Sequence, residues 1–241
     1  MLFLLRILYS LSNLKIYLFM SKLFCTFAPE IEKHIINLKR AYVLCKRMKS
    51  IFESGEFLNE RIQDSTYREL LTESRQFSQG GVISHKTTIF LSHKHQDLED
   101  LKGVIGLLRN KYNAQVYIDS MDDKMPSETT GATAQRIKQI IEKSNKFILL
   151  ATNNAIESTW CNWELGYGDA KKYYNHIAIF PIKPQGAADN QYKGHEYMQI
   201  YPHITYYNDY KKDWLGRLFL KKGYYVDYGN TSIPLQEWLN K

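Results

Sequence analysis

Short apolar runs alternate with amphipathic stretches over the second and third quarters of this 241-residue chain. The runs are too short for buried helices, and they are rich in β-branched and aromatic residues, as strands buried on both faces are. Four strands are therefore predicted, over residues 87–92, 115–119, 146–152 and 176–182. Between them, apolar residues recur every three or four positions, which predicts helices around residues 97–111, 132–142 and 158–170. This alternation favours an α/β fold with a parallel sheet covered by helices on both faces.

The segments on either side of this alternating region carry weaker patterns. Residues 31–77 are predicted to be helical, because apolar side chains such as Ile35 and Leu38 recur at helical spacing. A break rich in glycine and serine at residues 79–84 then marks the start of the main domain. Near the C-terminus, the pattern predicts a strand over 197–207, an amphipathic helix over 212–222, a strand over 223–229 and a helix over 233–241.

The first 47 residues are both apolar and basic. They contain eight lysines and arginines against two acidic residues, and charged side chains interrupt the most apolar part, residues 1–27. No apolar run reaches the roughly 20 residues needed to span a bilayer. Three interpretations stay open: an amphipathic helix at a membrane surface, a translated extension ahead of a functional start at Met20 or Met48, and, least favoured, a signal peptide. The predicted division is thus residues 1–47, a helical segment and linker at 48–84, and a main domain with a C-terminal extension at 85–241.

Composition narrows the classes of function. The net charge of +7 suggests nucleic-acid binding at first, but residues 48–241 carry 24 basic and 23 acidic residues, so the body of the chain is nearly neutral. A nucleic acid would need a local basic patch, and none is expected as a partner. The cysteines, Cys25, Cys45 and Cys161, lie far apart and form no CxxC pair. This spacing argues against disulfides and a zinc site, and it fits a reducing cytoplasm, with peripheral membrane contact of residues 1–27 left open.

Polar residues collect where the predicted strands end. Ser92, His93 and Lys94 stand at the end of the first strand, and Asp119 ends the second. The carboxyl ends of parallel strands are where such sheets bind their ligands. The chain contains neither GxGxxG nor GxxxxGK[ST], so neither a Rossmann site nor a P-loop is supported. A flavodoxin-like sheet with a different kind of site is therefore expected.

Four stretches of the chain, in order and spacing, resemble a TIR (Toll/interleukin-1 receptor) domain of the bacterial kind. They are TTIFLSHKHQD, VYIDSMDDKMPSETTG, KFILLATNNAIESTWCNWELGYG and IAIFPI, and the resemblance covers about residues 86–183. It implies a nucleotide pocket at Ser92, a BB loop at residues 120–131 and a catalytic glutamate at Glu164. The sequence departs from the family pattern at His93 and Lys94, where an aromatic residue or an arginine is more usual.

The resemblance also implies an activity. A TIR enzyme of this type would cleave NAD⁺, releasing nicotinamide and forming ADP-ribose or a cyclic isomer, as a signal or an NAD-depleting step in antiviral defence. NAD⁺ is then the substrate, no cofactor or metal is expected, and the residues expected to bind NAD⁺ are Ser92, His93, Asp119, Trp160 and Lys124. Self-association through residues 120–131 and an effector that senses the product are the implied partners. Two alternatives stay open: a non-catalytic TIR scaffold that acts through its BB loop, and an unrelated flavodoxin-like nucleotide-binding protein.

Glu164 stands in an apolar segment, STWCNWELGYGDA. In a helix, Trp160 lies one turn before it and Tyr167 one turn after it, so aromatic walls would flank the carboxylate and suit a cationic ring. Gly168 is expected to leave room beside the carboxylate, and Gly166 to let the helix pack closely. Because nicotinamide leaves as a neutral ring, no general acid is required, and one carboxylate can stabilise an oxocarbenium-like transition state.

Overall fold

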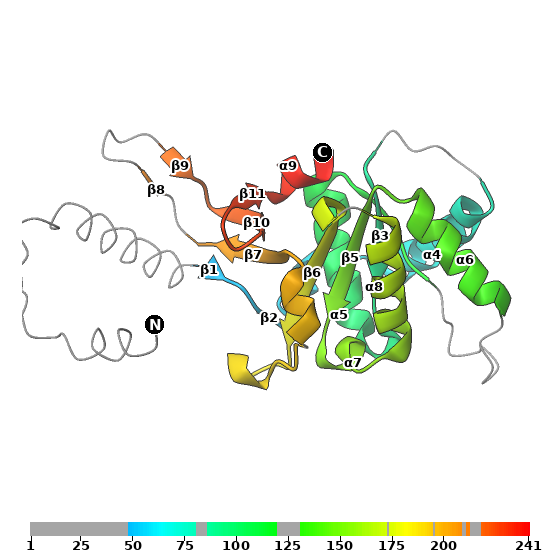
Figure 1. Cartoon of the computed structure of the whole chain (residues 1–241), viewed down its shortest axis with the longest axis horizontal. Coiled ribbons are helices and arrows are strands. Elements are labelled where there is room, and N and C mark those ends of the chain that lie inside the picture. The colour runs from blue at the N-terminus through cyan, green and yellow to red at the C-terminus, as the bar shows by residue number, and fades with distance from the viewer. Residues whose placement is uncertain are drawn as a thin grey trace, which may run out of the picture. The chain divides into compact units, whose positions relative to one another are not determined.

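The computed structural model describes residues 48–80, 86–119, 131–172, 174–194, 196–208, 211–212 and 218–241 (Figure 1). The chain divides into two compact units, Met1–Met48 and Lys49–Lys241. Apart from Met48, the first unit lies outside the described residues, so the interpretations of residues 1–47 stay predictions. Within the described residues, no helix combines the length and the apolar character that crossing a membrane requires.

A mixed sheet forms the centre of the fold. Its strands are β1 (Met48–Lys49), β2 (Phe52–Glu53), β3 (Thr88–Ser92), β4 (Gln115–Tyr117), β5 (Lys146–Ala151), β6 (Ile177–Lys183), β7 (His203–Tyr207), β10 (Gly223–Asp227) and β11 (Ser232–Pro234). They are ordered β11-β10-β7-β6-β5-β3-β4, with β1 paired to β7 and β2 to β6. β3 to β7 run parallel, whereas β10 and β11 are antiparallel to their neighbours. The order β4-β3-β5-β6-β7 is that of flavodoxin-like doubly wound sheets, which confirms the predicted fold class.

Helices cover both faces of the sheet (Figure 1). They are α4 (Asp64–Ser78), α5 (Leu98–Gly106), α6 (Gly131–Lys143), α7 (Asn153–Ile156), α8 (Thr159–Lys171) and α9 (Leu235–Asn240), and α5 continues as a π-helical turn, η3 (Leu107–Lys111). Alternate strand residues face opposite sides of the sheet. In β3, Ile89 and Leu91 therefore share one core with α4, α5 and α9. Phe90 shares the other core with α6 and α8. The four predicted strands lie within two residues of their expected ends, because each is a local apolar run.

Residues 49–80 contribute to the same core as the sheet. Phe52 of β2 packs against Phe180 of β6 with 4.9 Å between ring centroids, and Leu70 of α4 is fully buried in the same cluster. The expected boundary at residues 79–84 therefore does not separate two cores. The helical prediction for residues 31–77 is confirmed over 64–77, which lie in α4, but it is wrong over 48–63, where β1, β2 and the 3₁₀ turn η1 (Leu58–Glu60) are found. Residues 31–47 lie outside the described residues. Gly55, whose φ is 86°, allows the sharp turn after β2.

The C-terminal extension is mostly β structure. The predicted strand at 223–229 and the closing helix are confirmed as β10 and α9. The strand expected from residue 197 is shorter: 3₁₀ turn η6 (Glu196–Ile200) comes first, and β7 begins after Pro202, which has no N–H for the ladder. The helix expected over 212–222 is wrong at both ends, because β8 (Lys211–Lys212) pairs antiparallel with β9 (Leu218–Leu220). Two further 3₁₀ turns, η4 (Tyr174–His176) and η5 (Asp189–Gln191), flank β6, and another, η2 (His95–Asp97), follows β3.

Candidate active site

Ser92 occupies the carboxyl end of β3, beside the point where the strand order reverses between β3 and β5. In open α/β sheets, ligands bind at such a switch point. Because side chains alternate along a strand, Ser92 points to the same face as Phe90, which packs in the core with α8. Ser92 is only 1% exposed. The fold thus holds a buried hydroxyl at the ligand-binding edge of the sheet, on the side of α8.

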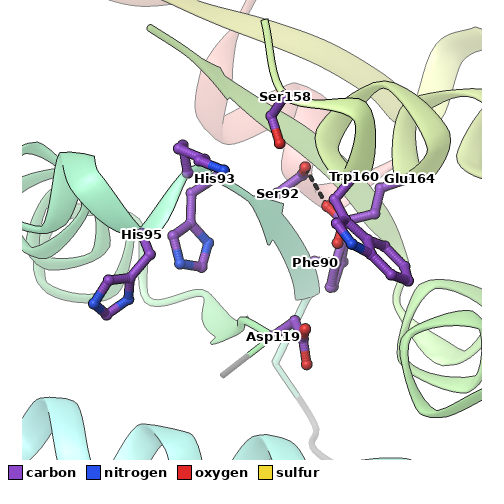
Figure 2. Close-up of a pocket in the computed structure, with 9 residues that line it drawn as sticks. Phe90, Ser92, His93, His95, Asp119, Ser158, Trp160 and Glu164 are labelled. Atoms are coloured by element: carbon purple, nitrogen blue, oxygen red, sulfur yellow. Dashed lines mark hydrogen bonds between the residues drawn. The ribbon is translucent and has the colours of Figure 1, made fainter. Parts of the chain in front are cut away.

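The helix α8 presents Glu164 to this hydroxyl. Ser158 is the N-cap of the helix, and its Oγ accepts a hydrogen bond of 3.4 Å from the Cys161 backbone N–H. Glu164 lies on the second turn and is 5% exposed. The Ser92 hydroxyl donates a hydrogen bond of 2.5 Å to Glu164 Oε2 (Figure 2). Two residues that are 72 positions apart in the sequence therefore form one buried polar pair.

The environment of Glu164 changes its acidity. Burial raises the pKa of Glu164 to about 8, because the apolar surroundings disfavour the charged form. The hydrogen bond from Ser92 acts in the opposite direction and lowers this pKa, while the negative charge of Asp119 raises it further. Glu164 is therefore mostly protonated at pH 7 in the empty pocket. A cation that enters the pocket favours the carboxylate form, because an opposite charge lowers the pKa of an acid.

Asp119 supplies a second carboxyl group near the pocket. It lies two residues beyond the end of β4 and is 6% exposed. Its Oδ1 accepts a hydrogen bond of 3.0 Å from Arg136 Nη2, and Arg136 comes from α6. Because Arg136 offsets the charge of Asp119, Glu164 is the better candidate for a carboxyl group that acts on a bound cation.

Residues 93–95 form another wall of the pocket. His93 Nδ1 lies 3.2 Å from the carbonyl oxygen of Leu91, and burial lowers the pKa of His93 to about 4, so its imidazole is neutral at pH 7. Lys94 and His95 also line the pocket. Neither residue was predicted from the sequence to bind substrate, although both directly follow the polar end of β3. Their position after a strand end was the signal that could have identified them as pocket residues.

The pocket is small. Its lining residues are Phe90, Ser92, His93, Lys94, His95, Asp119, Ser158, Trp160 and Glu164. Its volume is about 60 Å³, whereas pockets that enclose drug-sized ligands typically measure about 300–1,000 Å³. Figure 2 shows His93 and His95 across the pocket from Trp160 and Glu164. The described pocket can therefore hold only one end of a large ligand.

The structure brings together most of the predicted site residues. Those that line this pocket are Ser92, His93, Asp119, Trp160 and Glu164. Lys124 and residues 120–130 of the expected BB loop lie outside the described residues. Tyr167 does not form the expected second aromatic wall: its ring stacks on Trp163, with 5.9 Å between centroids, and its hydroxyl bonds Glu142 of α6. Only one side of the carboxylate is therefore flanked by an aromatic residue of α8, Trp160.

Comparison with known proteins identifies the family. A family model described as TIR domain matches residues 89–218, which is more than half of the chain. The chain belongs to the TIR domain family. Two curated relatives carry the names "Probable 3' cyclic ADP-D-ribose synthase ThsB'", from Bacillus cereus (strain MSX-D12), and "Putative cyclic ADP-D-ribose synthase TIR2", from Cytobacillus dafuensis.

The similarity to these relatives is partial. The Bacillus cereus protein is 30% identical over 119 residues, which is 48% of this chain and 60% of that protein. The Cytobacillus dafuensis protein is 31% identical over 85 residues, which is 33% of this chain and 21% of that protein. The match thus spans less than two thirds of the length of either relative.

Two glycines of α8 do not have the roles in the TIR domain that the sequence predicted for them. A Cβ atom at Gly168 would lie 2.9 Å from the ring of Phe147 in β5, so Gly168 allows close packing of α8 on the sheet. Gly166 is exposed, and nothing lies within 4 Å of the place where its Cβ would be. The expectation that Gly168 leaves room beside Glu164 is therefore wrong, as is the packing role for Gly166.

Alanine substitutions test this assignment of the two glycines. Gly168→Ala is expected to lower the free energy of unfolding by about 1–2 kcal/mol, because strain against Phe147 exceeds the gain in helix propensity. Gly166→Ala has space for its methyl group and is expected to raise the free energy of unfolding by up to about 1 kcal/mol. Urea denaturation of both variants measures the difference, and equal effects of the two substitutions would contradict the packing role of Gly168.

Cys161 lies beside the site but is poorly suited to act as a nucleophile. Burial raises the pKa of the Cys161 thiol to about 12, so the reactive thiolate is scarce at neutral pH. Its Sγ instead donates a hydrogen bond of 3.3 Å to the carbonyl oxygen of His93, which links α8 to the wall formed by residues 93–95. Within the described part of the TIR domain, no group of three or more His, Cys, Asp or Glu side chains could hold a metal ion.

Proposed function

We propose that this TIR-domain protein cleaves the bond between nicotinamide and ribose in NAD⁺, with Glu164 as the catalytic residue. The observation that carries the proposal is the buried Ser92–Glu164 pair, which lies beside Trp160 in a pocket at the switch point of the sheet. The names of the two relatives support the same substrate, because cyclic ADP-D-ribose is made from NAD⁺ with loss of nicotinamide.

The chemistry of the substrate fits one buried carboxylate. The nicotinamide ring of NAD⁺ is cationic, so its entry lowers the pKa of Glu164 and favours the carboxylate. As the glycosidic bond breaks, the ring departs neutral and positive charge develops on the ribose. A carboxylate in a site of low dielectric stabilises such charge strongly, and no general acid is needed for a neutral leaving group. Trp160 offers an aromatic surface for a cationic ring.

The same carboxylate can also assist the second half of the reaction. The group that attacks the ribose is water in the hydrolytic reaction, or an atom of the same nucleotide in the cyclising reaction. An attacking hydroxyl loses a proton as the new bond forms. Glu164, with a pKa near 8 in the empty pocket, is suited to accept that proton. The Ser92 hydroxyl, 2.5 Å from Oε2, fixes the orientation of the carboxylate during both steps.

The product and its use are part of the proposal. The relatives' names favour a cyclic isomer of ADP-ribose over the linear product. We propose that the product serves as a signal for a downstream effector in antiviral defence, or that the reaction depletes NAD⁺ for the same purpose. The small volume of the described pocket supports a further element of the proposal, that a second copy of the chain encloses the rest of the dinucleotide through residues 120–131.

Incubation of the purified protein with NAD⁺ tests the proposed activity. Nicotinamide release is followed by chromatography, and mass spectrometry separates linear from cyclic ADP-ribose. The assay covers a hundredfold range of protein concentration, because assembly would raise the activity per molecule at high concentration. Absence of nicotinamide release over the whole range would overturn the proposed activity. Release with constant specific activity would instead support a self-sufficient monomeric site.

A further inference from the structure

The wall of the pocket that carries Lys94 and His95 consists of the two residues after β3 and the start of the turn η2. Such a segment keeps its shape only through the contacts that hold it. One contact is internal, because the Asp97 backbone N–H donates a hydrogen bond of 2.9 Å to the carbonyl oxygen of Lys94. The second is the hydrogen bond from Cys161 Sγ to His93. A further contact is made by the side chain of Asp97.

The Asp97 carboxylate connects the loop after β3 to the loop after β5. Its Oδ2 accepts a hydrogen bond of 2.5 Å from Thr152 Oγ1, and its Oδ1 accepts one of 2.6 Å from Asn154 Nδ2. Thr152 is the N-cap of α7, and the same hydroxyl accepts a bond of 3.0 Å from the Ala155 N–H. We call the two bonds that link Asp97 to Thr152 and Asn154 the clamp. Because β3 and β5 flank the switch point, the clamp holds the edge of the sheet where the pocket opens.

The clamp bears on the binding of NAD⁺ because NAD⁺ carries both a cationic ring and anionic phosphates, and the pocket has to accommodate both. The carboxyl groups of Glu164 and Asp119 suit the cationic nicotinamide end of NAD⁺. The phosphates of NAD⁺ are anionic, and among the residues that line the described pocket Lys94 is the one lysine or arginine. Lys94 can bind phosphate only if its backbone is held toward the pocket. The Asp97 backbone N–H bonds to the Lys94 carbonyl oxygen, and the Asp97 side chain in turn fixes this residue to Thr152 and Asn154.

We propose that Asp97 is a positioning residue for the phosphate-bearing part of the substrate, acting by holding Lys94 and His95 at the mouth of the pocket. The proposal rests on the proposed function for its substrate, NAD⁺, but the clamp itself is independent of the reaction. Asp97 does not line the pocket, so its effect on the substrate passes through the wall that it fixes. Loss of the clamp should therefore weaken binding of NAD⁺ more than it slows the chemical step.

The chain offers a matched control three residues further on. Asp100 also uses both carboxylate oxygens to fasten a distant segment, accepting bonds of 2.7 Å from Ser54 Oγ and 2.7 Å from the Gly55 N–H. It lies in the first turn of α5, whose N-cap is Asp97, yet neither Asp100 nor its partners line the pocket. Asp97→Ala and Asp100→Ala thus each remove two hydrogen bonds from a carboxylate, but only the first removes them from the wall of the pocket.

The test measures kcat and KM for nicotinamide release, together with Tm, for the full chain and both variants. Loss of a hydrogen bond to a charged group weakens binding by about 10- to 100-fold. Asp97→Ala is therefore expected to raise KM by about this factor, while kcat changes by less than about threefold. Asp100→Ala should lower Tm and leave KM unchanged. In a double variant, Asp97→Ala should add little to the KM increase caused by Lys94→Ala, because both act on the same contact.

Several outcomes decide the proposal separately from the proposed function. If Asp97→Ala and Asp100→Ala both lower Tm and neither changes KM, Asp97 has only a structural role. If Asp97→Ala does not fold, Asn154→Ala is used in its place, because Asn154 is exposed and its substitution removes only one bond of the clamp. Asn154→Ala should also raise KM. An unchanged KM of Asn154→Ala would overturn the proposal. If the wild type releases no nicotinamide, the proposed function fails. The dissociation constant of NAD⁺, measured by calorimetry, then replaces KM. Asp97→Ala should still raise this constant by the same factor, and Asp100→Ala should not. Failure of the wild type to bind NAD⁺ would overturn both.

Discussion

Glu164→Gln is expected to reduce nicotinamide release by ~10²–10³-fold or more, the range found when one preorganised electrostatic group is removed from an active site. Glutamine keeps the size of the side chain and can still accept a hydrogen bond from Ser92, 2.5 Å away in the wild type. It cannot carry the negative charge that stabilises the developing cation on the ribose, and it cannot accept a proton. The measurement is single-turnover nicotinamide release at saturating NAD⁺, with Glu142→Gln as the control. Glu142 also accepts a hydrogen bond from a hydroxyl, that of Tyr167, but it lies on α6 and does not line the pocket.

The stability of this variant distinguishes lost chemistry from lost structure. The pKa of Glu164 is raised to about 8 in the folded protein from an ordinary value of 4.5. Between these values the native state binds more protons than the unfolded state, so the stability of the wild type falls as the pH rises. Glutamine has no such ionisation. Glu164→Gln should therefore have a Tm close to that of the wild type at pH 5 and a higher Tm at pH 9. A variant that is inactive and also less stable at pH 9 would mean that Glu164 supports the fold, contrary to the proposed role.

The sheet could be predicted from sequence because its strands are local. Residues 147–151 of the run 146–152 are apolar without interruption, and a strand buried on both faces needs no information from elsewhere in the chain. The errors arise where a segment depends on distant partners. Residues 48–63 become β2 and a turn because Phe52 and Phe57 pack on Phe180, which is more than 120 positions away. The segment around 218–220 has leucines that suit a helix, but β9 forms by pairing with β8.

The candidate site shows the same division between local and distant information. Ser92 and Glu164 could be singled out, since one ends a buried strand and the other is an acid in an apolar helix. Their direct contact could not be predicted, because it depends on how α8 lies against β3. The same uncertainty explains the two glycines: helical spacing shows that Gly166 and Gly168 lie on different sides of α8, but not which side meets Phe147. A sequence pattern gives the angular positions of residues around a helix, but only the packing of the helix shows which of them face the sheet.

The pH dependence of the reaction is expected to follow the ionisation of Glu164 in the free enzyme. Because kcat/KM reports on free enzyme, it should rise by ~50-fold between pH 6 and pH 8, as the ionised fraction of an acid with a pKa near 8 grows from about one hundredth to one half. His93 does not contribute to this rise, since burial lowers its pKa to about 4 and it stays neutral throughout. The profile of kcat should be displaced to lower pH, because bound cationic nicotinamide favours the carboxylate form.

Two variants test whether the pH dependence of kcat/KM comes from Glu164 or from another group that lines the pocket. Glu164→Gln should leave a residual activity that no longer rises between pH 6 and pH 8. His95→Gln, which has no imidazole at that position, should keep the rise in kcat/KM that is assigned to Glu164. If kcat/KM of the wild type is flat or falls over this range, either the carboxylate is already formed in the free enzyme or it is not required, and the activity of Glu164→Gln decides between the two. If that variant keeps the wild-type activity, the buried Ser92–Glu164 pair would have to bind the ribose without supplying charge, and the reaction would depend on some other group to stabilise the cation.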